Sequence, residues 1–192
     1  MNSLSDTVYT IHGFLSGDEG ELLYRLASEV PTNGNIVEIG SYQGRSTVCL
    51  GLGAKLAGAR VWAIDPHEGY QVNGTTHYGM ENYAALLKNL VEFEVADTVR
   101  VIALPSFSVV SVWTNPVDLL WIDGCHDYEM VKLDLVMWSE KGTPSGKIAL
   151  HDSSGHFPGV TRALTEFLMD GRWKIVEKVA ATAVLERIEV NG

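Results

Sequence analysis

The chain has 192 residues, enough for one domain with a sizeable core, and its 46% hydrophobic and 20% charged residues are ordinary for a globular protein. Its formal net charge of −10, without any basic run, argues against a nucleic-acid partner, because clustered Lys and Arg drive phosphate binding. The start of the chain lacks the pattern of a signal peptide, and no apolar run approaches the length of a membrane span. We therefore expect one cytoplasmic domain over residues 1–192, with no membrane partner.

Residues 1–33 predict an N-terminal helical segment. Ser16 and Glu19 have the spacing of a capping box, so a helix is expected to begin at Gly17. Pro31 is expected to end it.

Strands and helices are then predicted to alternate. Apolar runs predict strands at residues 36–39, 60–64, 99–103, 117–122 and 147–151. Helical periodicity predicts helices at residues 44–57, 80–93, 127–141 and 159–170, the third ended by Gly142 and Pro144. Nearly continuous apolar runs are typical of parallel strands covered on both faces. Residues 173–179 and 183–190 predict a terminal antiparallel hairpin. The fold class expected is α/β, a doubly wound, mostly parallel seven-stranded sheet.

Residues 67–79 stand outside this pattern. They are polar and rich in glycine and aromatic residues, and they follow the carboxyl end of a predicted strand. Ligands of open α/β sheets bind at that end. We hypothesise a lid over a cofactor, with a surface loop as the alternative.

The first candidate site follows the strand at 36–39. Gly40 and Gly44 lie four residues apart, but Ser41 and Tyr42 stand where a dinucleotide site would need Gly-x-Gly-x-x-Gly. Glu38 would sit awkwardly near a pyrophosphate, whereas it can accept hydrogen bonds from an ammonium group. These features favour S-adenosylmethionine over NAD.

Other residues complete this predicted cofactor site. The amides that open the next helix can bind a carboxylate, and Asp65 can accept from both ribose hydroxyls, although an NAD enzyme also uses an acid there. Ser106 occupies the place of an adenine contact, but it could serve only as a helix N-cap. The predicted cofactor-binding residues are Glu38, Gly40, Ser41, Tyr42, Gly44, Ser46, Asp65, Pro66, His67, Ser106 and Asp123.

The second candidate site combines acids and histidines. Asp123 ends the fourth predicted strand, and His151 and Asp152 end the fifth, so the three are expected side by side as ligands of Mg²⁺ or Mn²⁺. His126 is the candidate catalytic base, acting with Asp123. The alternatives are a turn at Asp123, a helix cap at His126 and a strand-end histidine at His151. Asp134 is expected on the solvated side of its helix.

These motifs resemble class I S-adenosylmethionine-dependent methyltransferases. More narrowly, they are similar to the small family that includes macrolide-sugar O-methyltransferases and cephalosporin-hydroxylase-like proteins. The resemblance covers roughly residues 34–155. It rests on Val37-Glu38-Ile39-Gly40-Ser41-Tyr42-Gln43-Gly44-Arg45-Ser46-Thr47, Ile64-Asp65-Pro66, Ile122-Asp123-Gly124-Cys125-His126-Asp127-Tyr128 and His151-Asp152.

The resemblance implies a Rossmann-like fold and a magnesium ion held by acids that end the fourth and fifth strands. It also implies that the histidine after Asp-Gly-x is the base, which supports roles for Asp123, His126 and Asp152. Relatives commonly carry an acid where this chain has His151.

The expected function is therefore S-adenosylmethionine-dependent, metal-assisted O-methylation of a small-molecule hydroxyl on a sugar or secondary metabolite. Two alternatives are a non-catalytic S-adenosylmethionine-binding or partner module, and an NAD-dependent oxidoreductase. The oligomeric state is left open, with a homo-oligomer among the options.

Overall fold

A computed structural model describes residue 4, residues 6–72 and residues 75–188. The main sheet comprises β1 (Asn35–Ile39), β2 (Arg60–Ile64), β5 (Val99–Ile102), β6 (Val117–Ile122), β7 (Gly142–Leu150), β8 (Trp173–Val179) and β9 (Thr182–Arg187). The helices are η1 (Asp6–Thr10), a 3-10 turn, and α1 (Gly17–Ser28), α2 (Arg45–Ala57), α3 (Met80–Glu92), α4 (Ser106–Val110), α5 (Tyr128–Ser139) and α6 (Pro158–Leu168). Nowhere in the part of the chain described here is a helix long and apolar enough to cross a bilayer.

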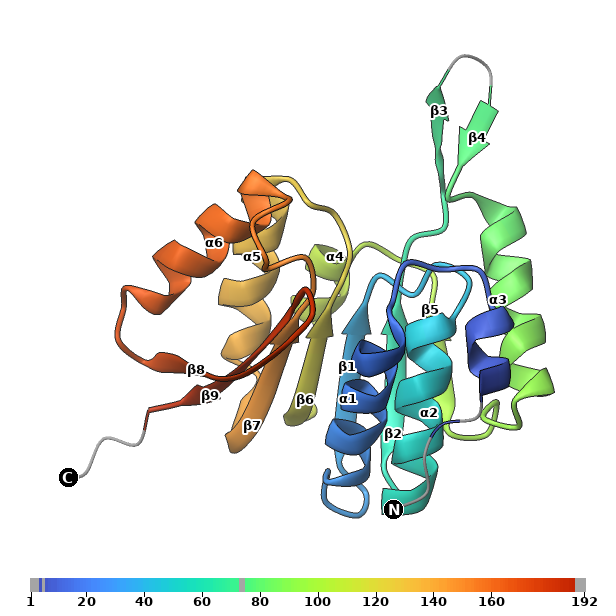
Figure 1. Ribbon diagram of the computed structural model, residues 1–192, viewed down its shortest axis with the longest axis horizontal. Coiled ribbons are helices and arrows are strands. Elements are labelled where there is room, and N and C mark those ends of the chain that lie inside the picture. Colours follow the sequence, from blue (N-terminus) through green and yellow to red (C-terminus); the bar gives the residue numbers. More distant parts are fainter. Residues whose placement is uncertain (1–3, 5, 73–74, 189–192) are drawn as a thin grey trace.

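The strand order is β5-β2-β1-β6-β7-β9-β8 (Figure 1). The first five strands in this order run parallel to one another, while β9 runs antiparallel to both β7 and β8. The predicted doubly wound, seven-stranded sheet with a C-terminal antiparallel hairpin is confirmed.

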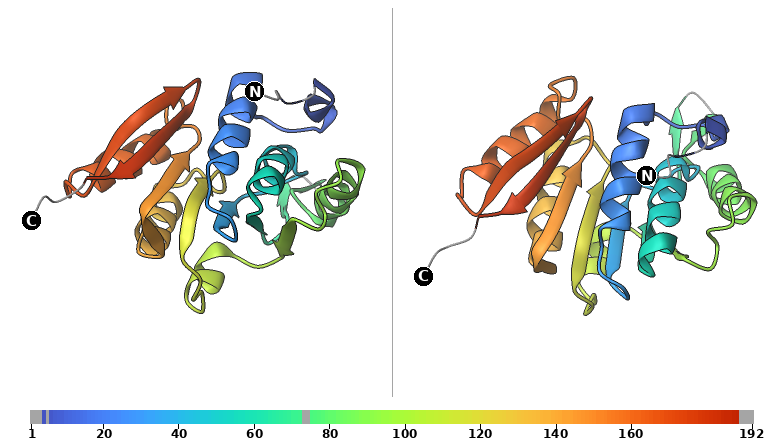
Figure 2. Two further views of the ribbon diagram at one scale, coloured as in Figure 1. Left: turned by 90° about the horizontal axis from the view of Figure 1, so that it is seen from below. Right: turned by 60° about the horizontal axis from the view of Figure 1, so that its bottom comes forward.

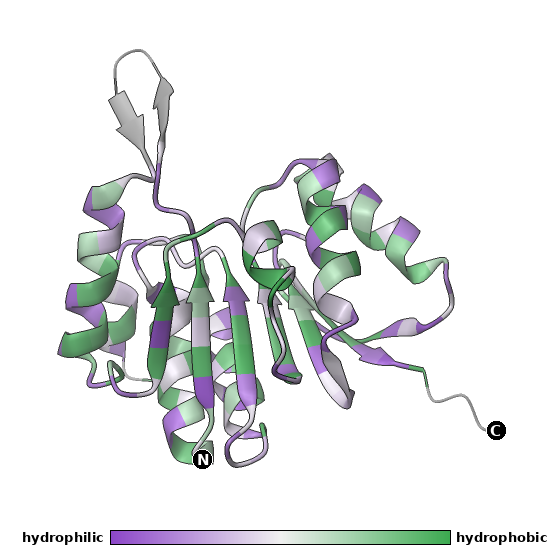
Figure 3. Ribbon diagram, turned by 180° about the vertical axis from the view of Figure 1, so that it is seen from behind, coloured by the Kyte–Doolittle hydropathy of each residue, from purple (hydrophilic) through white to green (hydrophobic). Residues whose placement is uncertain are grey.

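Two apolar cores lie on the two faces of the sheet. Side chains alternate along a strand, so Ile36 of β1 packs with residues of α1, α2 and α3, whereas Val37 packs with those of α4, α5 and α6. The blue α1 and cyan α2 accordingly lie on one face, and α5 and the orange α6 on the other (Figures 1 and 2). Green, apolar residues run along the strands between the layers (Figure 3).

The capping box at the start of α1 is confirmed. The Ser16 amide donates to Glu19 Oε2 at 3.0 Å, and the Glu19 amide donates to Ser16 Oγ at 3.4 Å. Both groups satisfy amides that the first helical turn leaves without partners. Glu19 is also 2% exposed, which a capping role alone does not require.

The strand predicted at 147–151 begins earlier, as β7. Val117 pairs with Gly142 and Leu119 with Lys147, so extra residues of β7 bulge between these two positions. Pro144 lies in the bulge. A proline cannot donate to a strand ladder, but a bulge tolerates it.

Residues 67–79 contain a hairpin, which sequence reasoning interpreted as a loop. β3 (Tyr70–Val72) and β4 (Thr75–His77) pair antiparallel, with Gln71 opposite Thr76. The hairpin projects from the carboxyl edge of the main sheet (Figure 1). Residues 73–74 of the hypothesised lid, like residues 189–190 of the predicted last strand, lie outside the described residues.

Candidate functional site

The carboxyl ends of four parallel strands line up at one edge of the sheet. One register row consists of Ile39, Ile64, Ile122 and Leu150. The next residue along each strand is, respectively, Gly40, Asp65, Asp123 and His151. The sheet order reverses at β1, and such switch points are where open α/β sheets bind ligands. The structure therefore brings the two predicted sites together.

The turn from β1 into α2 requires its first glycine. Gly40 has φ +88°, and a side chain there would collide with the carbonyl oxygen of Asp123. Gly44 has φ +92° and is the N-cap of α2, which begins at Arg45. The turn thus lies close to the end of β6, and the first backbone amides of α2 follow directly after the turn.

Asp65 binds this turn through backbone amides. Its Oδ2 accepts from the amides of Ser41 at 3.1 Å and Tyr42 at 3.0 Å, and its Oδ1 accepts from the amide of His67 at 3.0 Å. The side chain is 18% exposed. A carboxylate has about four acceptor positions, so these three bonds leave room for a further donor.

The two residues that follow Asp65 in the chain differ in their exposure to solvent. Pro66 is exposed, whereas His67 is 1% exposed, with its ring centroid 4.9 Å from that of Tyr83. Burial lowers the pKa of His67. His67 Nε2 lies 3.4 Å from Ser41 Oγ, so the ring contacts the glycine turn.

Glu38 is fully buried on the face of β1 that packs against α2. Ser46 Oγ donates to its Oε1 at 2.6 Å, while Oε2 has no hydrogen-bond partner among the residues described. Burial raises the pKa of Glu38 to about 8. The side chain is thus mostly protonated at neutral pH until a cation pairs with it.

The hydroxyl of Ser106 donates a hydrogen bond to a buried acid. The residue begins α4, with Pro105 rather than Ser106 as the N-cap. Its Oγ donates to Asp134 Oδ1, and Asp134 is 4% exposed, so the expectation of a solvated Asp134 is wrong. Burial raises the pKa of Asp134 to about 6. Because its proton is used on α5, Ser106 can only accept from a further ligand.

Asp123, His126 and Asp152 form a group with the geometry of a metal site. One ligand atom from each lies within 4.8 Å of the others. His126 Nε2 lies 2.8 Å from Asp152 Oδ2 but makes no hydrogen bond in the described part of the chain. The His126 ring stacks on Phe157, with centroids 4.2 Å apart. Two carboxylates beside an imidazole suit a hard divalent ion.

His151 lies beside this group, but its ring is already engaged. Nδ1 is 3.0 Å from Asp123 Oδ1 and 3.3 Å from Asp152 Oδ2, and Nε2 is 3.3 Å from Glu19 Oε1. Burial lowers the pKa of His151, but hydrogen bonds to Asp123 and Glu19 outweigh it and raise the pKa to about 10. The geometry thus groups His126, rather than the predicted His151, with the two acids.

Sequence reasoning missed two features around the site. Glu19 was interpreted only as a capping residue. A largely exposed aromatic cluster, whose side chains come from three separate segments, includes one residue of the glycine turn; it consists of His12, Phe14, Tyr42 and Tyr78. Phe14 is 71% exposed, and its ring stacks on that of Tyr42 at 6.0 Å. Only the aromatic residues themselves, scattered in sequence, could have signalled the cluster.

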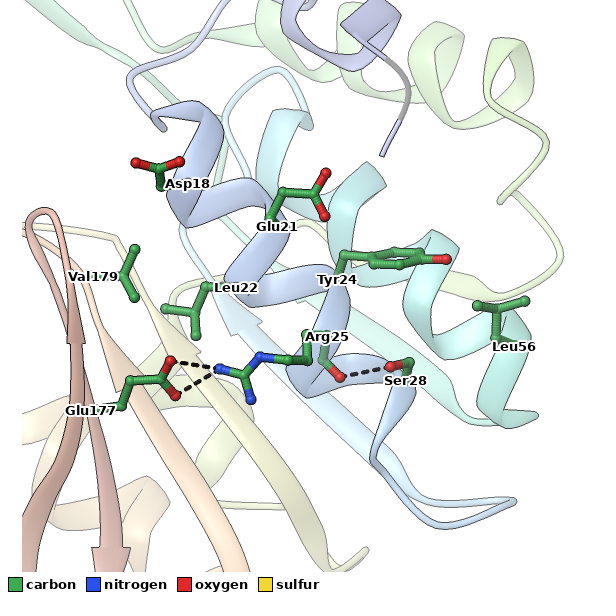
Figure 4. A pocket seen from close by; sticks show the side chains of 9 residues that line it. All are labelled: Asp18, Glu21, Leu22, Tyr24, Arg25, Ser28, Leu56, Glu177 and Val179. Carbon is green, nitrogen blue, oxygen red and sulfur yellow. Dashed lines mark hydrogen bonds and ion pairs between the residues drawn. The ribbon is translucent and has the colours of Figure 1, made fainter. Parts of the chain in front are cut away.

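A pocket of about 470 Å³ lies elsewhere, along the outer face of α1 (Figure 4). Arg25 spans it and donates to both carboxylate oxygens of Glu177, at 2.7 and 2.6 Å. None of the predicted cofactor or metal residues lines this pocket. It is therefore separate from the strand-end site.

A protein-family model described as "Methyltransferase domain" matches residues 37–153. The match runs from β1 to the residue after Asp152, so it includes both predicted sites. It covers more than half of the chain.

Three of the solved structures that share the fold are described as methyltransferases or methylases. The O-methyltransferase NovP aligns with a TM-score of 0.73 at 17% identity, over 93% of this chain and 83% of NovP. The O-methyltransferase from Bacillus cereus, in complex with S-adenosylhomocysteine (SAH), aligns with a TM-score of 0.68 at 18% identity, over 95% and 86%. An rRNA methylase from Streptococcus thermophilus aligns with a TM-score of 0.64 at 12% identity, over 92% and 100%. At these identities the likeness establishes the fold.

Proposed function

Since the chain belongs to the methyltransferase-domain family, as a class I S-adenosylmethionine-dependent methyltransferase, we propose that it methylates a hydroxyl of a small molecule with the help of a divalent metal ion. The observation that carries this proposal is the group Asp123, His126 and Asp152 at the switch point of the sheet. Two carboxylates beside an imidazole offer the oxygen and nitrogen atoms that suit a hard divalent ion.

The cofactor is proposed to lie across the end of β1. The free oxygen of Glu38 would accept from the ammonium group, and the first amides of α2 would bind the carboxylate. Asp65 would accept from the ribose, and Ser106 would accept from the amino group of adenine. Methyl transfer would then occur beside the end of β6.

Asp123 and Asp152 are proposed as the metal ligands, and His126 as the base. The hydroxyl oxygen attacks the methyl carbon in line with the carbon–sulfur bond, whose electron pair remains on sulfur. The hydroxyl proton passes to His126 Nε2, so the products are a methyl ether, SAH and an imidazolium. When bound, a divalent ion would lower the pKa of the hydroxyl and orient it.

The acceptor is proposed to be a sugar or secondary metabolite. The aromatic cluster of His12, Phe14, Tyr42 and Tyr78 offers an exposed surface beside the glycine turn, and such surfaces bind planar or apolar faces of ligands. The net charge of −10 supports a small acceptor over RNA.

The test is transfer of a labelled methyl group from S-adenosylmethionine to a library of sugars and phenols, with Mg²⁺ and with EDTA. We expect at least one hydroxyl acceptor and a large loss of turnover in EDTA, reversed by Mg²⁺. Transfer unaffected by EDTA would contradict the metal. Binding of S-adenosylmethionine without transfer to any hydroxyl would favour a non-catalytic binding module instead.

A further inference from the structure

A buried carboxylate connects the N-terminal helix to the strand-end site. Glu19 Oε2 accepts from the amide and hydroxyl of Ser16, at 3.0 and 2.7 Å, within the capping box. Its other oxygen, Oε1, accepts from the amide of Ala181 at 3.0 Å, in the turn before β9, and from Oγ1 of Thr182, the first residue of β9, at 2.9 Å. The same Oε1 lies 3.3 Å from His151 Nε2.

His151 links Glu19 to the acids at the ends of the strands. Its ring is 5% exposed, and Nδ1 bonds Asp123 Oδ1 at 3.0 Å. Glu19, His151 and Asp123 therefore form a continuous chain of contacts from α1 to the end of β6, in which Glu19 and His151 are buried. Since both ring nitrogens face carboxylate oxygens, the orientation of the ring is set at both ends.

We propose that Glu19 is a positioning residue, which holds the His151 ring through Nε2 so that Nδ1 orients the Asp123 carboxylate toward the metal. The inference rests on the proposed function, in which Asp123 is a metal ligand. Outer groups that fix the orientation of a ligand typically change metal affinity about 10- to 100-fold when they are removed.

Helix capping does not account for this arrangement. The capping box uses only Oε2 of Glu19, whereas His151 faces Oε1. The two roles can therefore be separated by mutation. Ser16→Ala removes the capping hydroxyl and leaves the contact with His151, while Glu19→Gln removes the charge that faces the ring.

The test measures Mn²⁺ binding by electron paramagnetic resonance and the ring ¹⁵N signals of His151 in the metal-free protein. We expect Glu19→Gln to weaken Mn²⁺ binding about 10- to 100-fold and to shift the His151 ring signals. Ser16→Ala should change Mn²⁺ affinity by less than about twofold, even where it lowers thermal stability as much as Glu19→Gln does. Equal effects of the two variants would overturn the proposal, because capping would then explain both.

A double-mutant cycle tests the route through the ring. In a His151→Gln background, Glu19→Gln should have almost no further effect on Mn²⁺ affinity; an undiminished effect would overturn the proposal. If Glu19→Gln does not fold, Thr182→Val, which removes one donor to Oε1, should weaken Mn²⁺ binding in the same direction but by less. No change would count against Glu19.

The ring signals keep this claim distinct from the proposed function. If the wild-type protein binds no Mn²⁺, the metal-assisted function fails. Glu19 is then judged by the metal-free His151 signals alone: a shift in Glu19→Gln supports the positioning role, and unchanged signals overturn it.

Discussion

Two histidines at the site differ in what their nitrogens face. His151 has a carboxylate at both ring nitrogens, whereas His126 has one, with Nε2 2.8 Å from Asp152 Oδ2 but without hydrogen-bond geometry within the residues described. An imidazole ring whose two nitrogens both face carboxylates is stabilised in its charged form. A ring nitrogen that makes no hydrogen bond can instead accept a proton. This difference supports the proposal of His126 as the base.

Replacing His126 tests that assignment. His126→Ala should leave S-adenosylmethionine affinity intact and lower turnover by roughly 10²–10⁴-fold, because only the proton acceptor is lost. Calorimetry and steady-state kinetics measure the two quantities, with His156→Ala, an exposed histidine, as the matched control. Unchanged turnover would remove His126 from the mechanism. Loss of Mn²⁺ affinity in the same variant would make it a ligand instead.

Glu38 gives a prediction about pH. Its pKa is raised from 4.5 to about 8, so between these values the folded protein holds a proton that the unfolded chain has lost. Raising the pH through this window therefore favours unfolding. Glu38→Gln should remove this pH dependence of stability. The difference in unfolding free energy between the variant and the wild type should then change by up to about 1.4 kcal/mol per pH unit.

Urea unfolding of the cofactor-free protein at several pH values between about 5 and 8 measures this difference in unfolding free energy. The linkage relation places the effect between the two pKa values of Glu38. The stability of Glu38→Gln relative to wild type should rise with pH. Parallel stability curves would show that Glu38 is already ionised in the folded protein, which would contradict the buried, neutral carboxyl.

Residue types at the site could be predicted from the sequence, but their partners could not. Asp123 and Asp152 were expected side by side because parallel strands end at one edge, and the register of β6 and β7 places them so. The role proposed for His151 involves Glu19, which lies far away in the sequence, in the first turn of α1, yet 3.3 Å from the His151 ring. No local pattern carries that information.

At the scale of elements, the turn between β1 and α2 depends on the absence of a side chain. Gly40→Ala would add both a positive-φ penalty and a clash with the Asp123 carbonyl. Gly171 also has a positive φ, of +73°, but open space around its Cβ position. Gly171→Ala should thus cost only about 1–2 kcal/mol of unfolding free energy.

Gly40→Ala should cost clearly more, about 3 kcal/mol or above, and should weaken cofactor binding, because the end of β6 must shift. Urea unfolding of the two variants gives the comparison. Equal costs would mean that the turn adjusts freely, and would contradict a rigid contact between Gly40 and Asp123.

The hairpin of β3 and β4 projects from the same edge of the sheet and is proposed as a lid. Deleting residues 70–76 should lower the affinity for S-adenosylmethionine, because a lid contributes contacts only when the cofactor is bound. Calorimetric titration measures the change. An unchanged affinity would leave the hairpin without a role in cofactor binding.

Elements with uniform apolar runs were predicted well. β1 and β2 begin and end within one residue of the expected positions, because strands covered on both faces leave a continuous signal. The first part of β7 was missed, since Gly142 and Pro144 indicate a break and only pairing with β6 makes them a bulged strand. The hairpin was missed because its strands have just three residues each.

At the scale of the whole molecule, the strand order creates the site. β1 lies between β2 and β6, so consecutive crossovers leave on opposite sides of it, and the ends of β1, β2, β6 and β7 converge. Residues far apart in the chain, from Glu19 to His151, are thereby brought to one edge. The family match from residue 37 to 153 spans this converging part of the sheet.

The most direct test of this account is a crystal structure of the protein with SAH and Mg²⁺ bound. We predict the nucleoside at the end of β1, with Glu38 facing its amino group and Asp65 its ribose. The ion should lie between Asp123 and Asp152, close to His126. A nucleoside bound with Glu38 and Asp65 turned away from it would contradict the account.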